Sequence, residues 1–155
     1  AGEVADGVLL NYLPASHVGT SIEQVRKGGN AKIYAYVHAA VGDFERSAKS
    51  ARKDLFNYAM ADGYARMFSQ AGFADEIKEL RARQAEKDRE GALAAVSDRM
   101  IQAIDFIGNK SEVTNFVKDY VKAGVEHPVL MPLPWGEDRR AITDATISAA
   151  IKAVT

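Results

Sequence analysis

The sequence predicts an α/β protein built on parallel strands, and three observations support this prediction. Apolar segments short enough to be buried strands occur at residues 6–13, 32–40 and 128–134. Segments with apolar residues at helical spacing lie between them. A strand, a helix and a second strand in succession favour a right-handed crossover, which makes the two strands parallel. We therefore expect the three strands in one parallel sheet, in sequence order, with helices packed outside.

The composition limits what kind of protein this is. A chain of 155 residues is long enough for one domain with a real core. The formal net charge of -1 gives no electrostatic reason to bind nucleic acid or an anionic membrane. The absence of cysteine excludes disulfides and thiolate chemistry and favours a cytoplasmic location. No apolar run approaches the roughly 18 residues that a membrane-spanning helix needs.

The first strand and helix have clear boundary signals. Asp6 and Gly7 form a turn at the start of the predicted strand 6–13, and Pro14 follows its end. Ser16 is a suitable N-cap for a helix that ends at two glycines, Gly28 and Gly29. The segment "KIYAYVHAAVG" then carries β-branched and aromatic residues, which predicts the second strand at 32–40.

Residues 43–108 lack period-two alternation and show helical spacing instead. Leu55 and Tyr58 begin this pattern, and a later face runs from Leu93 to Ile107. The stretch 78–90 is almost entirely polar, which is typical of a solvated helix face. We predict a helical insertion of two to four helices over 43–108, because a compact domain does not carry a bare loop of this length.

The last part of the chain returns to alternating helix and strand. Ser111 is a candidate cap for a helix with one continuous apolar stripe, and Gly124 ends it. The segment "HPVLMPLP" predicts the third strand at 128–134, with Pro128 at its entry, where a missing N–H costs least. Asp138 opens the final helix.

Three parallel strands make a poor sheet on their own. Both outer strands would present unpaired backbone groups, and apolar faces would stay uncovered. Closure into a barrel removes the edges. Together with the first residue, which is not methionine, this predicts that the chain is the C-terminal portion of a longer barrel protein. We expect it to associate, either with itself or with the missing N-terminal half of the barrel.

Three segments resemble a known family when taken in order. "AGEVADGVLLNYLPASHV", "KIYAYVHAAVG" and "KAGVEHPVLMPLPWG" are similar to the C-terminal half of luciferase-like oxidoreductases. The similarity is greatest to the deazaflavin-dependent branch that includes methylenetetrahydromethanopterin reductase. The resemblance implies a partial TIM (β/α)8 barrel in which residues 1–155 supply strands six to eight of one domain. The long helical insertion then precedes the last strand.

The resemblance also implies an activity. The leading hypothesis is an oxidoreductase whose complete form transfers hydride between the deazaflavin coenzyme F-420 and a small organic substrate. In such enzymes the cofactor carries the chemistry, and the protein binds and orients it. An FMN-dependent luciferase-like monooxygenase is the alternative enzyme. A non-catalytic half-barrel that pairs with itself or with another chain is the alternative of a different class.

Candidate site residues follow from the barrel. TIM barrels place chemistry at the carboxyl ends of their strands. At the first strand, Asn11 and Tyr12 are candidates for cofactor binding, although an asparagine here can also bond its own turn. At the second strand, His38 is a candidate catalytic proton donor; a single histidine in an apolar strand is more often structural.

The end of the third strand supplies the substrate-side candidates. Trp135 follows two prolines, and its flat ring can wall a heterocycle or seal the barrel end. Gly136 allows the backbone to turn. Arg139 and Arg140 begin the final helix and are candidates for a phosphate or carboxylate; the competing interpretation is an i,i+4 pair of Arg140 with Asp144. No metal site is expected, because three scattered histidines give no ligand spacing.

Overall fold

The computed structural model describes residues 1–154 and contains four strands among helices. The strands are β1 (Gly7–Leu10), β2 (Lys32–Val41), β3 (Asp105–Gly108) and β4 (His127–Pro132). The first and last parts of the chain contribute helices α1 (Ala15–Arg26), α7 (Lys110–Lys122) and α8 (Arg139–Val154). Between β2 and β3 lie α2 (Phe44–Ala59), α3 (Asp62–Phe68), the π-helical segment η1 (Ser69–Phe73), α4 (Ala74–Ala85), α5 (Arg89–Ala94) and α6 (Asp98–Ile104).

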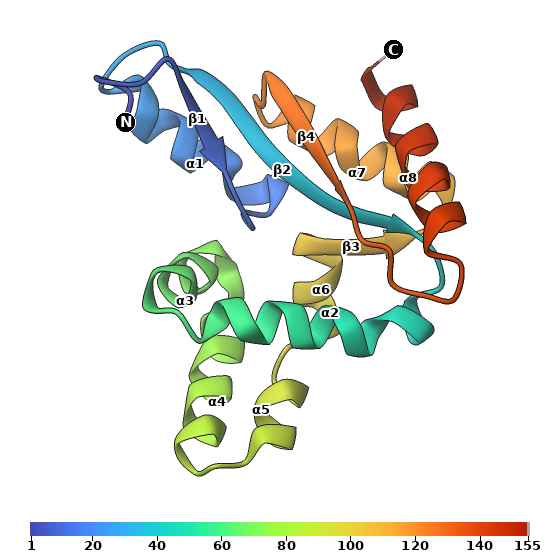
Figure 1. Ribbon diagram of the computed structural model, residues 1–155. Coiled ribbons are helices and arrows are strands. Elements are labelled where there is room, and N and C mark those ends of the chain that lie inside the picture. The colour runs from blue at the N-terminus through green and yellow to red at the C-terminus, as the bar shows by residue number, and fades with distance from the viewer. Residues whose placement is uncertain (155) are drawn as a thin grey trace.

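The long strand β2 lies at the centre of a parallel sheet (Figure 1). Its first half pairs with β1, from Gly7 opposite Lys32 onward, and its middle pairs with β4. Tyr34 and Ala35 have partners in both strands, so β1 and β4 lie on opposite edges of β2. All pairs are parallel, which confirms the predicted sheet of three strands in sequence order.

The two faces of the sheet have different surroundings. On β2, Ile33, Ala35 and Val37 are buried in a core shared with α1 and α7. Figure 1 shows α1 and α7 behind the sheet, with α8 beside β4. Because side chains alternate along a strand, Tyr34, Tyr36 and His38 point to the opposite face. The helix-covered face corresponds to the outside of a barrel and the opposite face to its interior.

The predicted insertion is a helical layer at the carboxyl ends of the strands. It contains five α-helices and η1, more than the two to four helices expected. Figure 1 shows α2 crossing below the ends of β1 and β2, with α3 at its left end and α4 and α5 below it. Leu55, Phe68 and Met100 are fully buried in its core, and Ala40 of β2 and Tyr12, just after β1, also belong to this core. The insertion thus covers the end of the sheet where barrel enzymes carry their sites.

One prediction for the insertion is wrong. Residues 105–108 are not helical; they form β3, which pairs with the last four residues of β2, from His38 opposite Asp105 to Val41 opposite Gly108. Ile107, assigned to a helical face by spacing, lies in this strand. The physical reason is tertiary: β1 ends at Leu10, so the carboxyl half of β2 has an unpaired edge that this segment fills.

Several predicted boundaries shift for local reasons. The first strand ends at Leu10, because Tyr12 has a φ of 54° and leaves the extended region. Helix α1 begins after Pro14, not after Ser16. Asn109 caps α7 in place of Ser111, in a capping box closed by Glu112. Within residues 1–154, no helix is both long and apolar enough to cross a membrane.

Candidate functional site

The structure brings Asn11, Tyr12 and His38 to the same end of the sheet. Tyr12 follows β1 and is buried, and its ring meets that of His38 edge to face with centroids 4.1 Å apart. His38 projects from the carboxyl half of β2 and is 4% exposed. The two candidates for cofactor binding and the candidate catalytic residue are therefore neighbours.

Tyr12 is tied to the insertion through α2. Its hydroxyl donates a hydrogen bond to Oδ2 of Asp54 at 2.7 Å, and its ring packs on that of Tyr58 with centroids 3.9 Å apart. Burial raises the pKa of the Tyr12 phenol far above its usual range, and the hydrogen bonds with Tyr58 and Asp54 add to the effect. Tyr12 is therefore a hydrogen-bond donor throughout the physiological pH range.

His38 is tied to the sheet through Asp105. Nδ1 of His38 lies 3.1 Å from Oδ1 of Asp105, and both side chains are buried. Burial raises the pKa of Asp105 to about 6; the hydrogen bond and charge of His38 oppose the rise, and Asp54 adds to it. Oδ2 of Asp105 is buried and has no hydrogen-bond partner within residues 1–154.

Asn11 lies at the edge of this cluster. Its Nδ2 donates to the hydroxyl of Tyr64 on α3 at 3.1 Å, and the side chain is half-buried. Asn11 thus bonds to the insertion, and not to its own turn as the alternative interpretation of the sequence had it. The ring of Tyr64 also meets that of Tyr12, with centroids 5.9 Å apart.

Sequence reasoning missed the partners of these residues. Asp105 was hidden in a segment assigned to a helix, and Asp54 is one of many charged residues in α2. One signal was available: Asp54 and Tyr58 are separated by four residues, which puts them on the same side of a helix. Nothing in that spacing indicates that this side faces Tyr12 and Asp105, because the contacts span 42 residues or more in sequence.

Trp135 borders a separate cleft of about 630 Å³. The cleft lies between the segment that follows β2 and the loop that follows β4, and its lining residues are Gly42, Asp43, Arg46, Ser47, Trp135, Gly136, Glu137, Asp138 and Ile142. Trp135 is half-buried and packs against the core of the insertion. Gly136 has a φ of 153°, which agrees with its expected role in the turn. Asp138 opens α8 as predicted, because its Oδ1 accepts from the backbone N–H of Ala141.

The two predicted arginines lie outside this cleft. Arg139 and Arg140 are exposed at the start of α8. Nε of Arg140 lies 3.9 Å from Oδ2 of Asp144, which is the i,i+4 pair that the sequence offered as the competing interpretation. Of the charged residues that line the cleft, three are acidic and only Arg46 is basic. That charge balance does not favour a phosphate in the cleft. The role of Arg139 and Arg140 in binding a phosphate or carboxylate stays a prediction.

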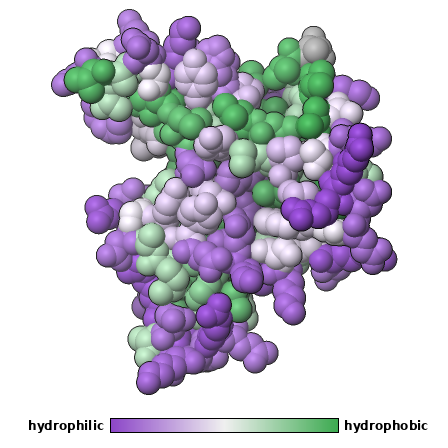
Figure 2. Space-filling model, viewed as in Figure 1, coloured by the Kyte–Doolittle hydropathy of each residue, from purple (hydrophilic) through white to green (hydrophobic). Residues whose placement is uncertain are grey.

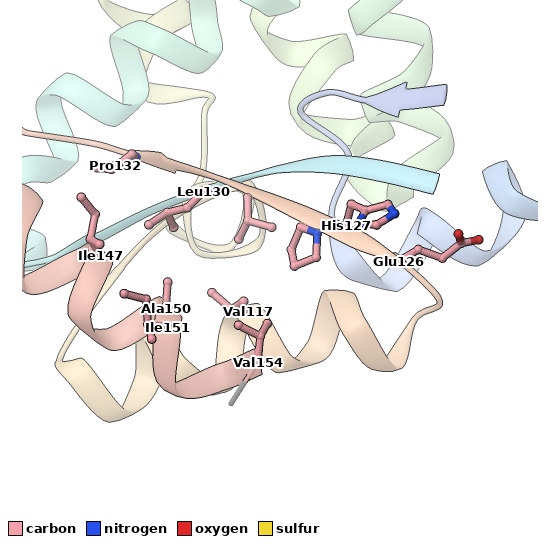
Figure 3. Close-up of a pocket in the computed structure, with 11 residues that line it drawn as sticks. Val117, Glu126, His127, Leu130, Pro132, Ile147, Ala150, Ile151 and Val154 are labelled. Atoms are coloured by element: carbon pink, nitrogen blue, oxygen red, sulfur yellow. The ribbon is translucent and has the colours of Figure 1, made fainter. Parts of the chain in front are cut away.

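A second cavity, of about 530 Å³, lies on the helix-covered side of the sheet. Figure 3 shows Ile147, Ala150 and Ile151 of α8 facing Leu130 of β4, with Val117 of α7 nearby. The lining is apolar apart from Glu126 and His127, which lie at one end of the cavity (Figure 3). This cavity lies on the opposite face from His38, so it is not part of the polar cluster.

Apolar side chains are also exposed on the face of the sheet that corresponds to the barrel interior. Leu9 of β1 and Met131 of β4 are 49% and 43% exposed, and Met131 is in register with His38. Figure 2 shows hydrophobic residues gathered across the upper part of the molecule, over the sheet and α8. Within the described part of the chain, no group of three or more acidic, histidine or cysteine residues is arranged to hold a metal ion.

A parallel sheet covered by helices on one face, with polar side chains at its carboxyl ends, is the architecture of an α/β-barrel segment. Comparison with known proteins agrees: the profile of the luciferase-like monooxygenase family matches residues 1–127, and the chain belongs to this family of oxidoreductases. Among solved structures it is similar to the coenzyme F420-dependent tetrahydromethanopterin reductase from Methanopyrus kandleri, with 18% identity and a TM-score of 0.71. The match covers 100% of this chain and 47% of the reductase, so the chain spans about half the length of that structure and has the fold of a partial TIM barrel.

Proposed function

We propose that this chain supplies strands six to eight of an oxidoreductase barrel that transfers hydride between coenzyme F-420 and a small organic substrate. The observation that carries the proposal is the cluster of Tyr12, His38, Asp54 and Asp105 at the carboxyl ends of the strands. In a luciferase-like barrel, this is the end where the active site lies. Family membership supports the class of chemistry, and the similarity to an F420-dependent reductase in fold supports the choice of cofactor.

The residues present fit one side of a cofactor site. Asn11 is half-buried, and its Nδ2 donates to the hydroxyl of Tyr64, which leaves Oδ1 to accept from a ring N–H or a hydroxyl. Tyr12 and His38 form a wall beside it, because Tyr12 is held by the half-buried Asp54 and His38 by the buried Asp105. Trp135 is proposed to wall the substrate side. When bound, the deazaflavin ring supplies the hydride chemistry, and these side chains orient it and exclude water.

An FMN-dependent monooxygenase is the second candidate. It is favoured by the family description itself, which names monooxygenases. The two candidates differ in the cofactor retained and in oxygen use: a monooxygenase consumes O₂ with reduced FMN, whereas an F-420 enzyme reduces or oxidises its substrate without O₂. The non-catalytic alternative predicts that the assembled protein binds neither cofactor.

The experiment compares cofactor binding by the chain alone and by the chain purified with the polypeptide segment that completes its barrel. We expect F-420 to bind the completed barrel with a submicromolar dissociation constant. The chain alone should bind F-420 and FMN more weakly than 1 μM, a free energy smaller in magnitude than about 8 kcal/mol, because most of the pocket walls are absent. Preference of the completed barrel for FMN supports the monooxygenase. No binding of either cofactor to it overturns the proposal.

A further inference from the structure

Strand β3 brings one carboxyl group to the polar cluster. Its first residue, Asp105, is the register partner of His38 on β2, so the two side chains lie next to each other on the same face of the sheet. Nδ1 of His38 lies 3.1 Å from Oδ1 of Asp105, and the two residues are 4% and 0% exposed. Within residues 1–154, Asp105 is the only hydrogen-bond partner of the His38 side chain. The pair is therefore an internal contact and not a surface ion pair.

Stability does not explain a carboxyl group at this position. Asp105 directly follows α6 and is its C-cap, where the helix dipole disfavours a negative charge. Its Oδ2 is buried and has no hydrogen-bond donor within residues 1–154, which adds the cost of an unpaired oxygen. A buried charged pair often fails to offset such costs. Residues that lower stability in this way are typical of functional sites.

The carboxylate determines which nitrogen of His38 carries a proton. Burial raises the pKa of Asp105 to about 6, so this carboxyl group is ionised at pH 8. An ionised carboxylate only accepts hydrogen bonds, so the hydrogen atom between the two side chains belongs to Nδ1 of His38. In the neutral imidazole Nε2 is then unprotonated, and it can act as an acceptor or a base.

Nε2 of His38 is available to a ligand. It has no hydrogen-bond partner within residues 1–154 and is not among the fully buried polar atoms of that range. His38 is in register with Met131, on the face that corresponds to the barrel interior. The ring of Tyr12 meets that of His38 edge to face at 4.1 Å, and the ring of Tyr36 lies 6.2 Å from it. These rings and the bond to Asp105 hold the imidazole, so the direction of Nε2 is fixed as well.

We propose that Asp105 is a positioning residue of the active site: it holds neutral His38 with the proton on Nδ1, so that Nε2 accepts an O–H or N–H group of the bound substrate. In this assignment His38 is the catalytic residue, and Asp105 acts through it. The use of Nε2 rests on the proposed function, whereas the protonation of Nδ1 does not. Because β3 belongs to the segment between β2 and α7, the insertion then supplies a residue to the site as well as covering it.

The first test is NMR of the full chain, which requires no cofactor. At pH 8, nitrogen-15 shifts of the imidazole rings distinguish the two neutral tautomers and the imidazolium. We expect His38 to be predominantly the Nδ1–H tautomer, and the signals of His17 and His127 serve as internal references. A predominant Nε2–H tautomer of His38, or an imidazolium that persists at this pH, overturns the proposal.

The variant Asp105→Val tests whether the carboxylate is the cause. Without it, an N–H on Nδ1 would be buried and unpaired, whereas an N–H on Nε2 would lie on the nitrogen that is not fully buried. We therefore expect Nε2–H to become the major tautomer of His38 in this variant. Asp75→Val replaces an exposed aspartate of the insertion and should leave the tautomer unchanged. Persistence of the Nδ1–H form in Asp105→Val contradicts the role of Asp105.

Kinetics of the completed barrel test the use of Nε2. We expect His38→Gln to lower kcat by about 100-fold and Asp105→Val to lower it by about tenfold or more, since general acid–base groups contribute on this scale. The dissociation constant of F-420 should stay unchanged in both. The double variant should be no slower than His38→Gln alone, because Asp105 acts only through His38. Losses that multiply in the double variant overturn the positioning role.

The outcomes separate this proposal from the proposed function. Near-UV circular dichroism establishes whether Asp105→Val keeps the native packing; if it does not, the tautomer of His38 in the unmodified chain decides the matter. Cofactor binding by the completed barrel together with an Nε2–H tautomer rejects the role of Asp105 alone. An Nδ1–H tautomer with no cofactor binding rejects the proposed function and the use of Nε2, but not the bond that fixes the tautomer.

Discussion

The hydroxyl of Ser47 donates a hydrogen bond to the backbone carbonyl of Trp135 at 3.1 Å, across 88 residues of sequence. Ser47 lies in the first turns of α2 and is 2% exposed, while Trp135 belongs to the loop that follows β4. The bond therefore joins the insertion to the loop that ends the sheet, at the cleft proposed for the substrate side.

Replacing Ser47 with alanine tests this connection. We expect Ser47→Ala to destabilise the fold by about 1 kcal/mol, the usual net value of one buried hydrogen bond, with the unpaired carbonyl as an added cost. Trp135 is the single tryptophan of the chain, so its fluorescence in urea titrations measures both stability and the packing of the loop. Ser50→Ala, at an exposed position of the same helix, is the control. Equal stability of the two variants would contradict the expectation.

The raised pKa of Asp105 predicts a definite dependence of stability on pH. Because its pKa rises from 3.8 to about 6 on folding, the folded state favours the protonated carboxyl group. This contribution is fully present below pH 3.8 and is lost as the pH rises through about 6. At about 1.4 kcal/mol for each tenfold change in proton affinity, the effect is on the order of 3 kcal/mol.

Urea titrations from pH 3.5 to 7.5 measure this contribution by comparison of the unmodified chain with Asp105→Asn. The asparagine resembles the protonated side chain, so we expect the stability difference between the two proteins to move in favour of the variant as the pH rises between 4 and 6. Asp62→Asn, at an exposed position, should show no such change over that window. A difference that stays constant with pH would mean that Asp105 is not the group responsible.

The sequence predicted those parts of the fold that local patterns determine. The three parallel strands and their flanking helices follow from apolar runs and turn residues, and the positions of Tyr12 and His38 at the carboxyl ends follow from the strand direction. Strand β3 could not be predicted in this way. Its four residues follow directly on helix α6, and their pairing depends on an edge of β2 that exists only in the assembled sheet.

The partners in the candidate site were unpredictable for the same reason. Asp54 lies in an amphipathic helix with several exposed charges, and only the docking of α2 distinguishes it from them. The apolar residues around Asp105 match helical spacing, so the local sequence predicts a helix where the structure has strand β3. The pairing of Arg140 with Asp144, in contrast, could be predicted from their i,i+4 spacing within one helix, and the structure contains it.

Gly136 provides a further test of the loop after β4. Its φ of 153° is unfavourable for a residue with a side chain, and an added Cβ would lie 2.7 Å from Cδ1 of Ile142. We expect Gly136→Ala to destabilise the fold by roughly 1–2 kcal/mol and to alter Trp135 fluorescence. Gly19 in α1 has nothing within 4 Å of an added Cβ, so Gly19→Ala should stabilise by about 0.5–1 kcal/mol. Urea unfolding of both variants measures these opposite signs; destabilisation by Gly19→Ala would contradict the account.

Association is the last expectation, and it arises from apolar surface on both sides of the sheet. Leu9 is exposed on the face that corresponds to the barrel interior, and Ile147 of α8 is 41% exposed beside the cavity behind β4. Contiguous apolar surface of more than a few hundred Å² is rare in soluble monomers. We propose that the chain pairs with itself or with the strands that complete its barrel.

Sedimentation at micromolar concentration measures this association. We expect a species heavier than the 16.8 kDa chain. Leu9→Glu and Ile147→Glu should each shift the distribution toward the monomer, because burying an unpaired carboxylate in an interface is costly. Ser148→Glu, at an exposed position next to Ile147, is the control and should leave the distribution unchanged. A single monomeric species that binds no hydrophobic dye would show that the chain is self-sufficient, since burial of its apolar surface would then require no partner.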